Sequence, residues 1–98
     1  MTLTDVIARI KPLEPDLRSR GIDSLYLFGS VARGEGGPSS DIDMMCELSS
    51  TKQVNLLDFA QFTFELEDHL GVKVDLCERQ ALRPRVRAFA ESEKVRIF

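Results

Sequence analysis

The sequence predicts a small α/β domain in which a mixed, mostly antiparallel sheet of three to four strands carries its helices mainly on one face. Short apolar runs at 25–28, 41–48 and 72–77 are typical of strands, and apolar residues at helical spacing precede and separate them. The loop between the first two strands is too short for a standard crossover between parallel strands. A doubly wound parallel sheet is therefore the weaker alternative.

Length and composition limit the classes of protein that the chain can represent. Its 98 residues predict one domain, 1–98, and its net charge of −3 does not favour a broad nucleic-acid-binding surface. Cys46 and Cys77 lie on expected strands without metal-ligand spacing, which indicates small buried thiols in a reducing cytosol. We expect a cytoplasmic protein, because no apolar run is long enough to span a membrane and the N-terminus lacks a secretory pattern.

The N-terminal segment has the pattern of a helix that packs on the sheet. Thr2 or Thr4 can cap this helix, and its apolar residues recur near helical spacing. Pro12 and Pro15 interrupt the pattern, which predicts a kink or two abutting helices that end before Gly21.

A longer helix is predicted over roughly 54–70, with its cap in the run 49–51 and its end at Gly71. His69 lies in the last turn without a partner for catalysis, so we interpret it as structural. Phe62 is placed at the edge of the apolar stripe. The main core candidates are Val54, Leu57, Phe59, Ala60, Phe64, Leu66 and Leu70.

The first strand leads into a turn that suits phosphate. Gly29 lacks a Cβ, so another group can approach its backbone closely, and Ser30 follows with a hydroxyl. The segment 30–34 is expected to form one helical turn whose free N–H groups attract phosphate oxygens.

The second strand begins with two carboxylates that share a face. Asp41 and Asp43 are two residues apart, so their side chains project from the same side of a strand and repel each other unless a cation lies between them. Mg²⁺ suits such a pair, because it takes carboxylates together with substrate phosphates. A phosphate-binding turn followed by a carboxylate pair predicts a metal–nucleotide site, whereas either half alone is also typical of an ordinary solvated turn or edge strand.

Asp75 lies in the middle of the third strand, where propensity and burial both disfavour an aspartate. Such a local conflict often marks a functional position. The structural alternative is that Asp75 pairs with Lys73 at the edge of the sheet.

Gly29-Ser30 with Ala32-Arg33-Gly34, followed by Ser40-Asp41-Ile42-Asp43, resembles the signature of the DNA polymerase beta-like nucleotidyltransferases. The chain is most similar to their minimal nucleotidyltransferase (MNT) branch. The resemblance supports the predicted fold and matches Asp75 to the family's third carboxylate. It implies that ATP is the substrate, that Gly29, Ser30, Arg33 and Ser40 bind the nucleotide, and that two Mg²⁺ ions are held by Asp41, Asp43 and Asp75. Arg33 has a second interpretation, as a brace that pairs with Glu35 or Glu47.

Members of this branch typically act beside a small helical HEPN-type toxin. The resemblance therefore implies an antitoxin that transfers AMP to a hydroxyl of its partner protein. The alternative hypothesis is an antitoxin that neutralises the toxin by binding alone and keeps a vestigial nucleotide site. The acceptor hydroxyl cannot be identified from the residues.

The C-terminal third combines basic and apolar residues. A short helix is expected from Pro84, and 91–94 is interpreted as a polar turn. The apolar end, 95–98, could cover the sheet or lie against a partner protein. A solvated helix face or a nucleotide- or partner-binding role would each explain four basic residues, Arg79, Arg83, Arg85 and Arg87.

Overall fold

The computed structural model describes residues 1–37 and 41–98, which form a four-stranded mixed sheet flanked by helices. The strand order is β3-β2-β1-β4, and β1 is antiparallel to both of its neighbours, whereas β2 and β3 are parallel. The strand bounds are β1 Ile22–Phe28, β2 Ile42–Leu48, β3 Val74–Glu78 and β4 Val95–Arg96. This arrangement confirms the predicted fold class.

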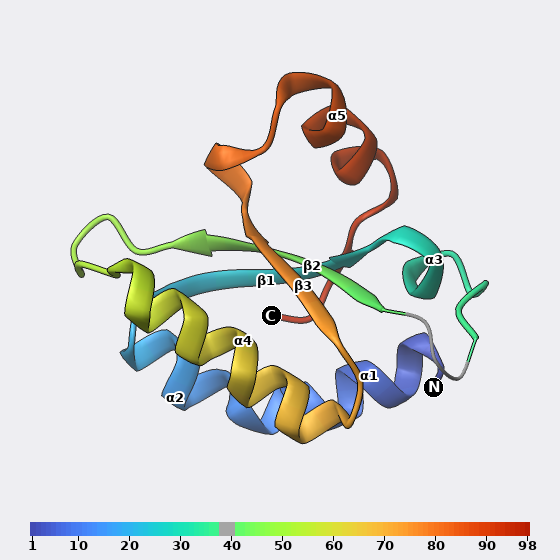
Figure 1. Cartoon of the computed structure of the whole chain (residues 1–98), viewed down its shortest axis with the longest axis horizontal. Helices are drawn as coiled ribbons and strands as arrows, with labels where there is room; N and C mark the ends of the chain where they lie inside the picture. The colour runs from blue at the N-terminus through green and yellow to red at the C-terminus, as the bar shows by residue number, and fades with distance from the viewer. Residues whose placement is uncertain (38–40) are drawn as a thin grey trace.

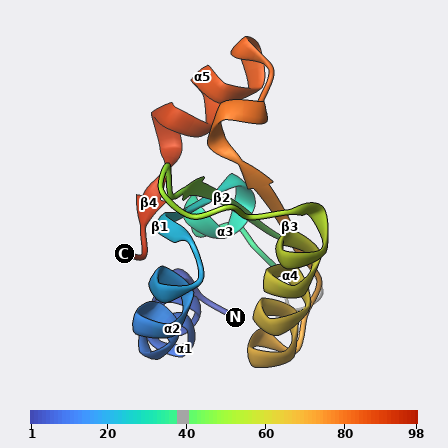
Figure 2. The same cartoon turned by 90° about the vertical axis from the view of Figure 1, so that its left-hand side faces the viewer.

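Most of the helical mass covers one face of the sheet. Helices α1, α2 and α4 lie along that face, and α5 stands over the other one (Figure 1). The end-on view shows the same two layers of helix on opposite sides of the strands (Figure 2). The helix bounds are α1 Leu3–Ile10, α2 Glu14–Ser19, α3 Gly29–Ala32, α4 Leu56–Leu70 and α5 Pro84–Glu93, with 3-10 turns η1 Lys11–Leu13 and η2 Arg79–Ala81.

The N-terminal helix is capped and interrupted as its sequence predicts. The Thr2 hydroxyl accepts the Asp5 N–H at 3.1 Å, and the Asp5 carboxylate accepts the Thr2 N–H at 2.9 Å. This reciprocal pair satisfies two backbone donors that a helix start leaves without partners. The two prolines divide the segment into α1, η1 and α2, which confirms the expectation of abutting helices.

Helix α4 connects the parallel strands β2 and β3, and it begins later than expected. Asn55 caps it, because the Asn55 side chain accepts the Asp58 N–H at 2.8 Å and the Asp58 carboxylate accepts the Asn55 N–H. The predicted cap in the run 49–51 was wrong. The hydroxyls of Ser49 and Thr51 bond each other at 2.9 Å within the preceding turn instead.

The predicted apolar stripe of α4 is confirmed at Leu66 and Leu70 and wrong at three other positions. Phe62 is only 1% exposed, whereas Leu57 and Phe64 are 80% and 64% exposed. The buried positions Phe62, Leu66 and Leu70 follow one another at four-residue spacing, so they share a face. The sequence holds enough apolar residues for two such faces, and docking on the sheet selected this one.

The larger core lies between the sheet and the face covered by α1, α2 and α4. It joins residues of α1 and α4 to the inward residues of the strands, which include Ile42, Met44, Val74 and Leu76. A smaller cluster lies on the opposite face, where Ala90 of α5 packs with Tyr26 and Met45. Alternate residues of β2 and β3 therefore face two different environments.

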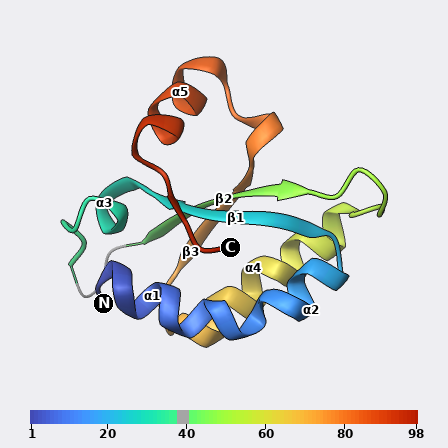
Figure 3. The ribbon, with the colours of Figure 1, turned by 180° about the vertical axis from the view of Figure 1, so that it is seen from behind.

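The C-terminal segment belongs to the fold. Residues of β4 pair with β1, and the Ile97 N–H donates to the Leu25 carbonyl at 2.8 Å. Figure 3, which views the chain from behind, shows this segment passing in front of β1. Ile97 and Phe98 are buried in the larger core, so the apolar end of the segment covers the sheet, whereas Arg96 is exposed. The large apolar residues that remain exposed are Leu56, Leu57, Phe64, Val86 and Phe89. Within 1–37 and 41–98, no helix combines the length and the apolar character that a membrane crossing needs.

Candidate active site

The end of β1 and the start of β2 meet at Gly29. Phe28 pairs with Asp43 across the two strands, and Gly29 follows with φ +78° at the start of α3. A Cβ at Gly29 would overlap the Asp43 carboxylate. Glycine is therefore required here both by its backbone conformation and by the carboxylate beside it. The predicted strand, glycine turn and short helix are confirmed.

The carboxylates predicted for the site come together at one end of the sheet. Asp43 on β2 is the register partner of Asp75 on β3. Neighbouring side chains of both strands point into the larger core, so Asp43 and Asp75 project from the opposite face. Asp41 lies just before β2 and is exposed. Asp41 thus precedes the strand that carries Asp43, and Asp75 lies on the neighbouring strand.

The electrostatics of this end favour a cation. Burial raises the pKa of Asp43, and the negative charges of Asp75 and Asp41 raise it further. No three or more His, Cys, Asp or Glu residues in the described part of the chain are arranged to hold a metal ion by themselves. A divalent ion with one or two protein carboxylates and several substrate oxygens fits this donor set.

Asp75 lies on the edge strand and is exposed, and it forms no ion pair with Lys73 among the residues that the structure describes. The structural alternative for Asp75 therefore has no support in the contacts. Its function in the site remains a prediction.

Arg33 follows α3 and is held by two carboxylates. Its guanidinium lies 2.9 Å from Glu35 and 2.9 Å from Glu93, whereas Glu47 pairs with Arg79. The bracing role is thus present with Glu35 and absent with Glu47. Ser30 lies half-buried on α3, and Ser40 lies outside the described residues.

Glu93 was missed by the sequence analysis, which interpreted 91–94 as a polar turn. That interpretation was wrong, because α5 continues through Glu93. The Gly29 N–H donates to Glu93 Oε1 at 2.7 Å, and the two residues are 64 positions apart. No local spacing could indicate this contact, since it arises only when α5 folds back over the sheet.

The basic residues of the C-terminal third separate into two groups. Arg79 is paired with Glu47 at 2.7 Å and with Glu91 at 2.6 Å, so it joins η2 to β2 and α5. Exposed or half-buried arginines that form no ion pair within 1–37 and 41–98 are Arg83, Arg85 and Arg87. Because Arg79 is bound to its own carboxylates, the four arginines do not act as a single basic cluster.

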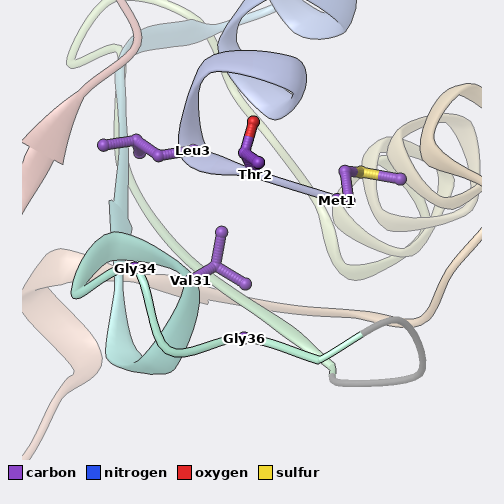
Figure 4. Close-up of a pocket in the computed structure, with 6 residues that line it drawn as sticks. All are labelled: Met1, Thr2, Leu3, Val31, Gly34 and Gly36. Carbon is purple, nitrogen blue, oxygen red and sulfur yellow. The ribbon is translucent and has the colours of Figure 1, made fainter.

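Two hollows in the surface lie away from the carboxylates. One, of about 90 Å³, is lined by the start of α1 and by Val31, Gly34 and Gly36, and Figure 4 shows Val31 pointing toward Thr2. The other, of about 160 Å³, lies beside Arg20 and Phe62 between α2 and α4. The smaller hollow borders the predicted phosphate-binding segment at Val31 and Gly34, but neither hollow is lined by Gly29, Ser30, Arg33 or the three aspartates.

A glycine turn beside neighbouring aspartates on a mixed sheet suits the binding of a nucleotide and a divalent ion. Residues 8–97 match the model of the nucleotidyltransferase domain family. The chain therefore belongs to this family and is a nucleotidyltransferase, which confirms the resemblance seen in its sequence.

Individual relatives agree with this assignment. A candidate protein adenylyltransferase of Methanocaldococcus jannaschii is 31% identical over 98 residues, which is the full length of both chains. A solved structure of a candidate minimal nucleotidyltransferase superposes with a TM-score of 0.81 at 34% identity, covering 97% of this chain and 95% of that one. The MNT antitoxin family fold also appears in a complex with a tri-AMPylated Shewanella oneidensis HEPN toxin, at a TM-score of 0.70, 17% identity and coverage of 97% and 71%. At that identity, the last comparison supports the fold alone.

Proposed function

We propose that this chain transfers AMP from ATP to a hydroxyl of a partner protein. The observation that carries the proposal is the register pair Asp43 and Asp75 directly beside the Gly29 turn. This arrangement brings a place for phosphate and a place for a divalent ion to one end of the sheet. The family and the adenylyltransferase relative support the same reaction class.

The transfer is an in-line displacement at the α-phosphorus of ATP. The acceptor oxygen forms a bond to that phosphorus, the bond to the β-phosphate bridging oxygen breaks, and pyrophosphate leaves. Asp75 is placed on the exposed edge strand, where it can accept the proton of the attacking hydroxyl. Gly29 and Ser30 are proposed to bind the β- and γ-phosphates.

Two Mg²⁺ ions would be held by Asp41, Asp43 and Asp75. The ions would neutralise charge on the triphosphate and lower the pKa of the acceptor hydroxyl. The raised pKa of Asp43 is the observation of this chain that favours such a cation, because a nearby positive charge removes the like-charge conflict with Asp75.

A small helical HEPN-type toxin is the proposed acceptor, which makes this chain an antitoxin. The support is the AMPylated toxin found with a protein of the same fold. Neutralisation by binding alone is not favoured, because all three aspartates are present, Asp43 lies against Gly29 and Asp75 is its register partner. The proposed location is the cytoplasm, in agreement with free Cys46 and Cys77, whose pKa values burial raises to about 12 and about 11.

The test is a transfer assay with the purified chain, a HEPN-type toxin, Mg²⁺ and ATP that carries label on either the α- or the γ-phosphate. We expect the α-label to appear on the toxin and the γ-label to remain in pyrophosphate. Mass spectrometry of the toxin should then find AMP on a side-chain hydroxyl. The matched control is the Asp41→Asn/Asp43→Asn variant, checked for folding by circular dichroism.

Label transfer from the γ-phosphate would overturn the reaction class. Rescue of toxin-expressing cells by the double variant, with normal toxin binding and no transfer, would overturn modification as the neutralising step. We expect the double variant to bind the toxin and to fail to rescue.

A further inference from the structure

Glu93 occupies two donors that the sequence predicts for the nucleotide, the Gly29 N–H and the Arg33 guanidinium. Its carboxylate accepts the Gly29 N–H at 2.7 Å and lies 2.9 and 3.1 Å from Arg33 Nη1. The Glu93 side chain is 14% exposed and that of Arg33 is 38% exposed, so the bond to Gly29 is partly buried and the bonds to Arg33 are open to solvent. A carboxylate and a phosphate oxygen make the same kind of charge-assisted bond to an N–H group and a guanidinium.

In this contact the Glu93 carboxylate gains hydrogen-bond donors, but it also brings a further negative charge to the site. A largely buried carboxylate needs donors, and Gly29 and Arg33 supply them. The same carboxylate also adds negative charge near Asp43, and the two carboxylates repel each other. Because repulsion between carboxylates offsets part of what the hydrogen bonds contribute, a nucleotide that brings its own cation can displace Glu93.

We propose that Glu93 is an intramolecular substitute for a phosphate group. It occupies the Gly29 N–H and the Arg33 guanidinium until a nucleotide displaces it. The inference rests on the proposed function and adds the regulation of the same site. Glu93 is the last residue of α5, and β4 begins two residues later at Val95. Nucleotide binding is therefore coupled to the end of α5 and to the strand that closes the sheet.

Competition between Glu93 and the nucleotide predicts a measurable change in the dissociation constant of the nucleotide. When a binding-competent state is only a fraction of the population, the apparent dissociation constant is raised by the inverse of that fraction. If Glu93 holds the donors in about nine molecules out of ten, its removal tightens binding about tenfold. Adenosine, which has no phosphate, should gain nothing.

The experiment measures the dissociation constants of ATP with Mg²⁺, of tripolyphosphate with Mg²⁺ and of adenosine by calorimetry. The proteins are the full chain and the variants Glu93→Ala, Glu93→Gln and Glu35→Ala. Glu35→Ala is the matched control, because Glu35 also pairs with Arg33 but forms no bond to Gly29. Thermal melts report whether each variant is folded. The Gly29 amide, observed by nuclear magnetic resonance, reports the loss of its acceptor.

We expect Glu93→Ala to bind ATP and tripolyphosphate about tenfold more tightly and adenosine unchanged, with a smaller gain for Glu93→Gln. The Gly29 amide signal should move in Glu93→Ala without ligand, and in the wild type only when ATP is added. If Glu93→Ala is unstable, Glu93→Gln keeps the side-chain volume and tests the same point.

Weaker ATP binding in a folded Glu93→Ala protein would overturn the proposal and make Glu93 a brace that positions Arg33. An equal gain in Glu35→Ala would also overturn it, because the effect would then come from freeing Arg33 or from lower net charge. Failure of every protein, the wild type included, to bind ATP would overturn the proposed function and this inference together. ATP binding by the wild type with no gain in the variants would overturn the inference alone.

Discussion

The two faces of the sheet differ in what covers them. On the face under α1, α2 and α4, the side chains of β2 and β3 join one large apolar core. On the other face the same strands present Asp43 and Asp75, and only a small cluster around Ala90 covers part of it. Alternation along the strands allows one short segment to serve both environments.

This difference separates the residues that hold the protein together from those that we propose for chemistry. Apolar burial stabilises the first face, at roughly 25 cal/mol per Å². The second face brings like charges together, which costs stability unless a cation or a donor offsets it. Substitutions on the first face should therefore destabilise the fold, and substitutions on the second should change binding or transfer.

The largest expected effect is in the covered face. Phe62→Ala should lower the free energy of unfolding by about 3–5 kcal/mol, because it leaves a cavity in the core beneath α4. Phe64→Ala, on the same helix but exposed, should change it by less than about 0.5 kcal/mol. Urea denaturation of both variants measures the contrast. A similar loss in both would mean that the docked face of α4 has been assigned incorrectly.

An intermediate effect is expected at the open edge of the site. Asp75→Asn should slow AMP transfer by about a hundredfold or more, as for loss of a general base, with little change in unfolding free energy. Single-turnover transfer and ATP titration separate the rate from the affinity. Lys73→Ala is the control for general changes at this strand edge. Near-normal transfer combined with reduced stability would remove Asp75 from the set of reacting groups.

The smallest expected effect is a gain in stability. The pKa of Asp43 is raised in the folded state above its ordinary value of 3.8, so the folded state holds this proton more tightly than the unfolded state does. Stability should then fall as pH rises from about 3.8 through the raised pKa, and the charged form should remain a cost at neutral pH. Asp43→Asn should raise the melting temperature by a few degrees at pH 7 without metal.

The gain in Asp43→Asn should disappear in strong acid, where the wild-type carboxyl is also neutral. Melts across pH in the presence of a chelator measure it, with the exposed Asp68→Asn on α4 as control. A destabilised Asp43→Asn protein at neutral pH would show that the carboxylate is favourably bonded and not in conflict with its neighbours.

Several features that depend on neighbouring residues were determined by the sequence itself, although the equally local Asn55 cap of α4 was missed. The Thr2 cap, the interruption by two prolines and the glycine turn at Gly29 each involve contacts over a few positions. The shared face of Asp41 and Asp43 was predicted from the two-residue period of a strand, but Asp41 lies just before β2, so this feature stays a prediction. The family signature lies in this same local stretch, which is why the class of enzyme could be predicted without the structure.

Features that depend on distant segments were decided by the tertiary structure. The pairing of Asp43 with Asp75 needs the register of parallel strands, and the bond between Gly29 and Glu93 needs α5 to fold back over the sheet. The choice of Phe62 over Phe64 as the buried side of α4 needs a sheet to dock against. In each case the local sequence allows several arrangements of similar energy, and only packing between segments far apart in the chain distinguishes them.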